Sequence, residues 1–405
     1  MGERRTVYLD YAASAPRRSE CLAVERAFDE GPLDGANPNS LHTSGRAAAT
    51  ELERARATVA RCLGGGFRPS DVIWTSGGTE SNNLAVMGIS QGVHLRDGSR
   101  NTVVISAIEH DSIVDLVSSL HDRGLDVRVV RPGRDGRISP EALAEVVDTS
   151  VALVSIMYAN NETGIVQDIP ALSSVAHASG AIFHTDAVQA FGHIQLELDG
   201  VDAVSVAAHK LGGPVGVGAL AVRGRVPLRP LLFGGGQEAG RRAGTQDVRG
   251  AMAFAATAEA CCRDVETTRA LVAVRAQHLY DALCVPGTGI FSTTTPQMGS
   301  DRLPGIVSVM VPGIDSETMI LALDDLGFEV SAGSACSSTS LDASHVLTAM
   351  GIERESALGS LRISFDERVP EEDLMSFADA LISVVNRLSV SSKSSRRHGQ
   401  GRSNA

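Results

Sequence analysis

Short apolar segments alternate with helix-like segments over the first two thirds of the chain, and this alternation limits the fold more than any other feature. Seven segments have the length and β-branched content of buried strands: 71–75, 102–106, 126–130, 152–157, 181–185, 203–207 and 218–222. Helix-like segments lie between them, at 81–89, 111–123, 140–147 and 169–179. The pattern predicts an α/β fold whose large domain has a mainly parallel seven-stranded sheet flanked by helices.

The remainder of the chain predicts a smaller domain. Strand candidates at 305–310 and 361–365 enclose a helix-like segment at 316–326, which is typical of an α+β domain. A long helix-like segment at 250–282 leads out of the large domain. We expect four parts: an N-terminal segment packing with the small domain (1–15), the large domain (16–264), the small domain (265–387) and a disordered basic tail (388–405).

Charge and cysteine content exclude several classes of function. The net charge of −12 argues against direct binding to nucleic acid. No apolar run reaches the ~20 residues of a membrane span, and the N-terminus has no signal-like stretch, so we expect a cytoplasmic protein without membrane contact. None of the six cysteines forms a CxxC pair, so we expect reduced thiols and no metal site.

Lysine occurs only twice, at Lys210 and Lys393, and every other Lys/Arg position is arginine. A chain that avoids lysine retains it where arginine cannot replace it, because arginine stays protonated and cannot form a Schiff base. Lys393 lies in the predicted tail, whereas Lys210 lies in an apolar, glycine-rich stretch. Chance retention of a surface lysine is the alternative, but these surroundings favour a catalytic lysine.

Polar residues follow the ends of successive predicted strands, where parallel sheets bind ligands. Gly78 and Thr79 open a helix after the first strand and predict an anion cradle, although an ordinary capped turn has the same pattern. His110 follows the next strand, where a capping or core histidine is the alternative. Asp186 follows a later strand, and a buried aspartate there needs a cationic partner unless it is a helix N-cap.

These weak signals combine into one prediction. A phosphate cradle, a stacking histidine, an acid and a lone lysine after successive strands are what a pyridoxal phosphate site requires, because a protonated pyridine ring acts as an electron sink.

The same segments resemble the cysteine desulfurases, within them the NifS/IscS-like group of the fold-type I (aspartate aminotransferase-like) pyridoxal-phosphate enzymes. The resemblance runs from residue 8 to about residue 365. The matching motifs are YLDYAA (8–13), NP (37–38), GGTESNN (77–83), EH (109–110), NNE (160–162), HTDAVQ (184–189), HK (209–210), GGGQE (234–238), RAGT (242–245) and SACSS (334–338).

The resemblance implies a role for each matching residue. Lys210 would hold the cofactor covalently and, with His110 and Cys336, form the catalytic set. The cofactor contacts implied are Gly78, Thr79 and His209 to the phosphate, Asp186 to the pyridine nitrogen, Gln189 and Asn161 near the ring oxygen, and His110 stacked on the ring. Thr245 would reach the phosphate of a neighbouring subunit, which implies a homodimer. Arg362 would bind the substrate carboxylate, with Asn37 also at the substrate.

The sequence departs from the family pattern at several positions. Ala207 and Ala208 replace the serine and glycine that usually precede the His-Lys pair, so one phosphate hydroxyl is missing. Val215 replaces a lysine, and Ser14-Ala15 replaces a Thr-Thr pair. These changes remove no group that the chemistry needs.

Cys336 decides which reaction the resemblance implies. It lies within ten small residues, 331–340, that offer little to bury it, so we expect an exposed thiol on a mobile loop rather than a small core cysteine. The implied reaction converts L-cysteine to L-alanine and leaves the sulfur on Cys336 as a persulfide. A selenocysteine lyase or aminotransferase of the same fold is the nearest alternative, and a non-catalytic subunit that keeps the fold is another.

The sequence does not identify the sulfur acceptor. Iron–sulfur scaffolds, tRNA thiolation enzymes, DNA phosphorothioation systems and thio-cofactor pathways all use such donors.

Overall fold

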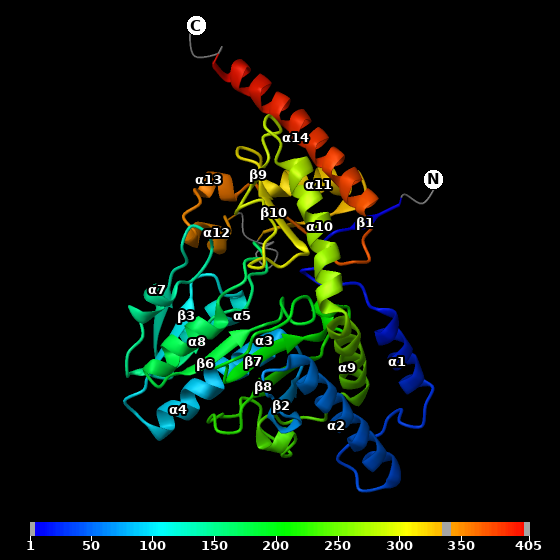
Figure 1. The fold of residues 1–405 in the computed structure, drawn as a ribbon, viewed down its shortest axis with the longest axis vertical. Coiled ribbons are helices and arrows are strands. Elements are labelled where there is room, and N and C mark those ends of the chain that lie inside the picture. Colours follow the sequence, from blue (N-terminus) through cyan, green and yellow to red (C-terminus); the bar gives the residue numbers. More distant parts are fainter. Residues whose placement is uncertain (1–4, 334–341, 401–405) are drawn as a thin grey trace.

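A seven-stranded sheet forms the centre of the large domain (Figure 1). The computed structural model describes residues 5–333 and 342–400, with side chains through residue 390. The sheet order is β2-β8-β7-β6-β5-β3-β4. The strands are β2 (Val72–Thr75), β3 (Thr102–Ser106), β4 (Asp126–Val130), β5 (Val151–Ser155), β6 (Ile182–Asp186), β7 (Ala203–Ala207) and β8 (Gly218–Val222). Only β8 runs antiparallel to its neighbours β2 and β7, so the predicted mainly parallel sheet is confirmed.

Helices cover both faces of this sheet because successive strand residues face opposite sides. Val72 and Trp74 pack on one face, whereas Ile73 packs on the other. The first face is covered by α2 (Thr43–Leu63), α7 (Pro140–Ala144), α8 (Ile169–Ala178) and α9 (Val248–Arg263), and α1 (Ser19–Asp29) packs on α9. The second face is covered by the π-helical turn Leu84–Ile89, α4 (Ser90–Arg96), α5 (Asp111–Val114) and α6 (Leu116–His121).

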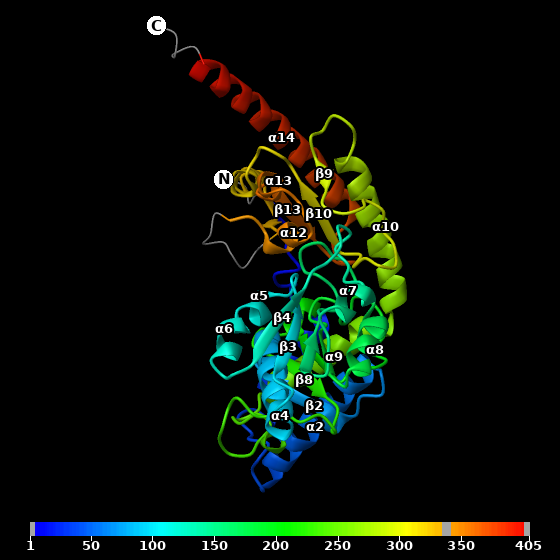
Figure 2. The same ribbon diagram turned by 90° about the vertical axis from the view of Figure 1, so that its left-hand side faces the viewer.

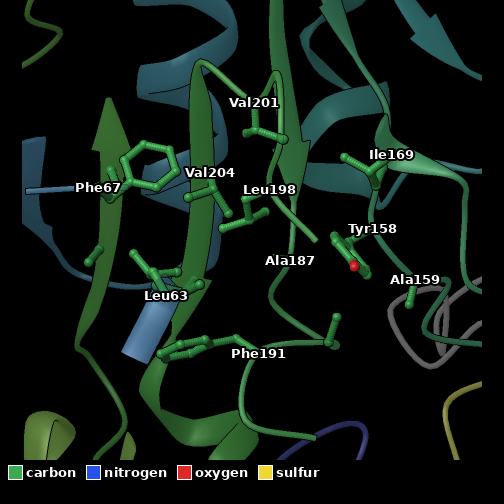
Figure 3. Packing of buried hydrophobic residues seen from close by; sticks show 14 of the residues in the cluster. Leu63, Phe67, Tyr158, Ala159, Ile169, Ala187, Phe191, Leu198, Val201 and Val204 are labelled. Carbon is green, nitrogen blue, oxygen red and sulfur yellow. The ribbon is translucent and has the colours of Figure 1, made fainter. Parts of the chain in front are cut away.

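The core on the first face joins segments that are far apart in sequence (Figure 3). Leu63 at the end of α2, Phe191 after β6 and Val204 on β7 are each at most 2% exposed. Phe254 of α9 contacts the Phe191 and Trp74 rings edge-on, with centroids 6.2 Å apart in both pairs.

The small domain contains a four-stranded sheet of order β12-β13-β10-β9. Its strands are β9 (Phe291–Ser292), β10 (Ile306–Met310), β12 (Ser331–Ala332) and β13 (Ser360–Ser364). Its helices are α10 (Val265–Leu283), α11 (Ser316–Asp324), α12 (His345–Ala349), α13 (Arg354–Ala357) and α14 (Glu371–Gln400). α10, α11 and α14 contribute to its core. In both ribbon views this domain lies above the large domain (Figures 1 and 2).

The N-terminal segment belongs to the small-domain core and then enters the junction between the domains. β1 (Val7–Tyr8) pairs in parallel with β11 (Phe328–Glu329). Leu9 is fully buried in the small-domain core. Asp10 forms a parallel β-bridge with Ser364. The residues that follow Asp10 therefore lie at the edge of the large domain.

One predicted element, the long helix-like segment at 250–282, differs from the structure. The segment 250–282 is two helices, α9 and α10, interrupted at Asp264 (φ −119°, ψ 27°), because aspartate competes with the helix for backbone hydrogen bonds. Helix α14 runs from Glu371 to Gln400 and so extends into the segment 388–405, for which disorder remains a prediction. Extending an anchored helix avoids the cost of nucleation. No described helix is long and apolar enough to span a membrane.

Candidate active site

The candidate site is built where five strands of the large sheet end. The cradle residues follow β2, His110 follows β3, Asn161 follows β5, Asp186 ends β6 and Lys210 follows β7. Parallel strands present their carboxyl ends at one edge of a sheet, which brings these side chains together.

Close backbone approach shapes the turn after β2. Gly77 has a φ of 151°, and a Cβ on Gly218 of the adjacent β8 would lie 2.7 Å from Gly77 Cα. A Cβ on Gly78 would lie 2.9 Å from Val188. Helix α3 (Gly78–Asn83) follows this turn and begins three residues before the predicted helix-like segment 81–89. Thr79 is exposed in its first turn.

Asp186 is linked to His110 through two intervening side chains. Asp186, 5% exposed, accepts hydrogen bonds from Asn82 Nδ2 at 2.6 Å and from the Val188 N–H at 2.9 Å. Asn82 Nδ2 also donates to Ser112 Oγ at 2.9 Å, and Ser112 Oγ lies 2.9 Å from His110 Nδ1. One chain of polar contacts thus joins β6, α3 and α5.

The protonation of His110 follows from its place at the start of α5. The Ser112 backbone N–H donates to His110 Nδ1 at 3.0 Å, so this ring caps the helix. An accepting Nδ1 leaves the proton of the neutral ring on Nε2. The alternative of a capping histidine is therefore correct for Nδ1, and it leaves Nε2 as the nitrogen that can carry a proton.

Lys210 meets the N-terminal segment. It lies on a 3₁₀ turn, Ala208–Leu211, that ends at Gly212 with φ 82°. Its Nζ donates to the carbonyl oxygens of Ala12 at 2.6 Å and Ala13 at 3.0 Å. Gln189 Nε2 donates to the same Ala12 oxygen at 2.9 Å. The N-terminal segment thus connects the lysine to the predicted ring-contact residue.

His209 precedes this lysine and is predominantly neutral near pH 7. Burial, with the Lys210 charge adding to it, lowers the pKa of His209 to about 4. A neutral imidazole can still donate one hydrogen bond to an anion.

Arg362 approaches the site from β13 of the small domain and is 1% exposed. Its Nη1 donates to the Asn161 carbonyl at 3.0 Å, and its Nη2 donates to Asp10 Oδ1 at 2.8 Å. Its buried Nε has no hydrogen-bond partner within the described part of the chain. A buried donor without a partner leaves capacity for an anionic ligand.

Two predicted residues, Asn37 and Thr245, lie on exposed loops beside this cluster. Their loops are connected by Asn39 and Gln246, whose side chains bond at 2.9 Å. This loop pair adjoins the cradle through the ion pair of Arg242 with Glu80, at 2.8 Å. Cys336 lies outside the described residues.

Sequence reasoning missed two residues that orient predicted ones. Asn82 orients Asp186, and the signal was the first of two asparagines that precede the apolar run LAVMGI. Asp10 orients Arg362, and the signal was an acid between apolar and aromatic neighbours. Both signals require a partner that sequence alone does not identify.

Comparisons with known proteins place this site in context. The class-V aminotransferase family model matches residues 7–377. The chain is similar to the cysteine desulfurase IscS of Dictyoglomus turgidum, with 35% identity over 388 residues, 95% of this chain and 96% of that protein. It is also similar to the IscS-like cysteine desulfurase of Mycobacterium tuberculosis, with 38% identity over 392 residues, 94% of this chain and 96% of that protein.

Two solved structures share the fold. A NifS-like protein has a TM-score of 0.85 at 31% identity and covers 94% of this chain and 99% of its own. DndA from Streptomyces lividans has a TM-score of 0.73 at 32% identity, with coverages of 89% and 99%.

Because of the buried carboxyl group of Glu109, beside His110, we expect folding stability to depend on pH. Burial raises the pKa of this fully buried carboxyl to about 8, against an unfolded value near 4.3. Between these values the unfolded chain ionises while the folded protein stays protonated, so folding stability falls by up to ~1.4 kcal/mol per pH unit. Glu109→Gln should therefore gain stability relative to the natural chain as the pH rises from 5 to 8. Denaturant unfolding at several pH values measures this, and a pH-independent difference between the two proteins contradicts it.

Proposed function

This chain belongs to the class-V aminotransferase family and, within it, to the NifS/IscS-like cysteine desulfurases, and we propose that it uses pyridoxal phosphate and Cys336 to move sulfur from L-cysteine to an acceptor protein. The observation that carries this proposal is the meeting of Lys210, the Asp186–His110 chain of contacts and buried Arg362 at one edge of the sheet.

The site residues fit pyridoxal phosphate. Asp186 is a buried carboxylate whose two recorded donors, Asn82 and Val188, are neutral, so it retains acceptor capacity for a protonated pyridine nitrogen. The glycine turn after β2 leads into a helix and matches a phosphate group. Thr79 in the first turn of that helix and His209 after β7 would add donors for the phosphate, and Arg362 Nε offers one for a carboxylate.

Different residues would hold the cofactor and the substrate. When bound, pyridoxal phosphate supplies an electron sink for the carbanion that remains after an amino acid loses its Cα proton. The residues that would hold it are Gly78, Thr79 and His209 at the phosphate, Asp186 at the pyridine nitrogen, Asn161 and Gln189 near the ring oxygen, His110 at the ring face and Lys210 at the aldehyde carbon. Arg362 and Asn37 would hold the substrate, Arg362 at its carboxylate.

The remaining steps use protons and sulfur on this chain. The Lys210 amine removes the Cα proton, which requires its neutral form. The Cys336 thiolate attacks the substrate sulfur, and the carbon–sulfur bond breaks with its electron pair left on the substrate carbon. The sulfur remains on Cys336 as a persulfide, and alanine is released after the carbon skeleton takes up a proton at that carbon and regains the Cα proton from Lys210. His110 Nε2 holds a proton that can pass to or from the thiol groups.

We further propose a cytoplasmic homodimer that shares its active sites. Leu41 is 88% exposed and Phe233 is 77% exposed, on the two loops that also carry Asn37 and Thr245. Large apolar side chains exposed near a polar site are typical of a subunit interface. The Arg242–Glu80 ion pair holds the Thr245 segment next to the cradle. The sulfur acceptor remains open among the pathways named above.

Lys210→Ala tests the cofactor assignment. The variant should lose the yellow chromophore and the formation of alanine from L-cysteine, because the cofactor-holding amine and the base are both removed. Lys393→Ala, at the other lysine of the chain, should keep both. Absorbance spectra and an alanine and sulfide assay measure this. A chromophore in Lys210→Ala that borohydride fixes to the protein contradicts the assignment, and absence of alanine formation by the natural chain contradicts the desulfurase reaction.

Thr245→Ala tests the shared site. A lost hydrogen bond to a charged group costs about 1.5–3 kcal/mol, so pyridoxal phosphate should bind roughly 10- to 100-fold more weakly. The exposed Thr267→Ala, at the start of α10, should leave the affinity unchanged. Conversely, Ala207→Ser should tighten binding, because Ala207 Cβ lies 3.7 Å from the Cβ position of Gly78 in the cradle. Absorbance titration of the apoenzyme measures affinity and sedimentation measures the oligomer. A monomer whose affinity is unchanged by Thr245→Ala contradicts the proposal.

A further inference from the structure

The buried carboxyl group of Glu162 lies beside residues that precede and follow the segment 334–341, which carries Cys336. The chain enters residues 334–341 from Gly333 and continues after them at Asp342. Glu162, 3% exposed, accepts a hydrogen bond at Oε2 from the hydroxyl of Ser344, which is 2% exposed. The same Oε2 would lie 3.0 Å from a Cβ built on Gly333. One oxygen therefore contacts Ser344 and packs closely against Gly333.

Ser344 transmits this contact to a helix. Its Oγ also accepts from the Leu347 backbone N–H at 3.2 Å, so Ser344 is the N-cap of α12. The next residue, His345, bonds through Nε2 to the Glu109 carbonyl at 3.0 Å. The first turn of α12 is thus fixed to the large domain by two adjacent polar contacts.

Apolar packing holds α12 on the same two loops. Val346, Leu347 and Met350 form a buried cluster with Ile108 and Met157. Ile108 lies two residues before His110, and Met157 lies four residues before Asn161. The helix that follows the Cys336 segment therefore rests on the loops that carry two of the proposed cofactor-binding residues.

The carboxyl group of Glu162 also interacts electrostatically with Arg362, the proposed ligand of the substrate carboxylate. Burial raises its pKa, while the Ser344 hydrogen bond and the charges of His345 and Arg362 favour its ionised form. Arg362 donates to the carbonyl of Asn161, the residue directly before Glu162. A buried carboxyl is costly unless its contacts compensate, so these contacts determine how the segment ends are held.

We propose that Glu162 is a positioning residue for sulfur transfer, fixing Gly333 and Ser344 relative to His110 and Asn161 and thereby setting where Cys336 can reach. This inference rests on the proposed role of Cys336 as the sulfur-receiving thiol. Glu162 accepts its hydrogen bond from Ser344, and no hydrogen bond joins it to Arg362 among the described residues. Its removal should therefore affect sulfur transfer more than substrate binding.

Single-turnover kinetics of the cofactor-loaded enzyme separate these two steps. On mixing with L-cysteine, Glu162→Ala should show the same initial change in cofactor absorbance as the natural chain. Persulfide on Cys336, measured by alkylation and mass spectrometry, should appear about 10- to 100-fold more slowly, as expected for losing a hydrogen bond to a charged group. Glu162→Gln, whose amide oxygen can accept from Ser344, should recover most of the rate.

A double-mutant cycle identifies the contact responsible. Ser344→Ala should slow persulfide formation similarly, and Glu162→Ala with Ser344→Ala should be little slower than either single variant. Asp315→Ala, which removes the N-cap of α11 in the same domain, controls for loss of a cap and should transfer sulfur normally.

Each outcome bears on one proposal. Wild-type persulfide formation in Glu162→Ala, or an equal slowing of the initial absorbance change, overturns the positioning role. Additive effects of Glu162→Ala and Ser344→Ala overturn their coupling and with it the inference. No persulfide on Cys336 in the natural chain overturns instead the proposed role of Cys336.

Discussion

The hydrogen bond between the Asp186 carboxylate and the Asn82 amide, 2.6 Å long, is the interaction on which the candidate site depends. It joins the end of β6 to α3, and Asn82 continues through Ser112 to His110 on α5. Because Asp186 and Asn82 are both buried, each fixes the orientation of the other. The site therefore has a defined orientation of acid and imidazole built into the large domain.

The small domain completes the site through connections far apart in sequence. The N-terminal segment contributes Leu9 to the small-domain core, pairs Asp10 with Arg362 and offers the Ala12 carbonyl to Lys210. In the C-terminal part of the chain, α12 packs on the loops after β3 and β5. The residues proposed to bind the cofactor and the substrate are thus held by elements of both domains.

Much of the fold could be predicted because burial leaves a local pattern. Strands such as β5 and β7 are buried along their whole length and read as continuous apolar runs. The interruption at Asp264 was missed because apolar residues continue on both sides of it.

The site was predicted less completely than the fold. Lys210 and Asp186 stood out as a rare residue type and a strand-end acid, whereas the roles of Asn82 and Asp10 depend on partners more than a hundred residues away. The close approach of Gly218 to Gly77 likewise depends on which strands are neighbours. Such pairings arise from the fold and leave no local signature.

The central claim is that Cys336 receives the sulfur, and transfer of radiolabelled sulfur from L-cysteine to the protein tests it most directly. Cys336→Ser should retain the absorbance change on mixing with cysteine, because Lys210 and Asp186 are intact, but should acquire no label. Cys284→Ser, at a half-buried cysteine of the small domain, should be labelled normally. Label on another cysteine of Cys336→Ser at the rate of the natural chain would contradict the account.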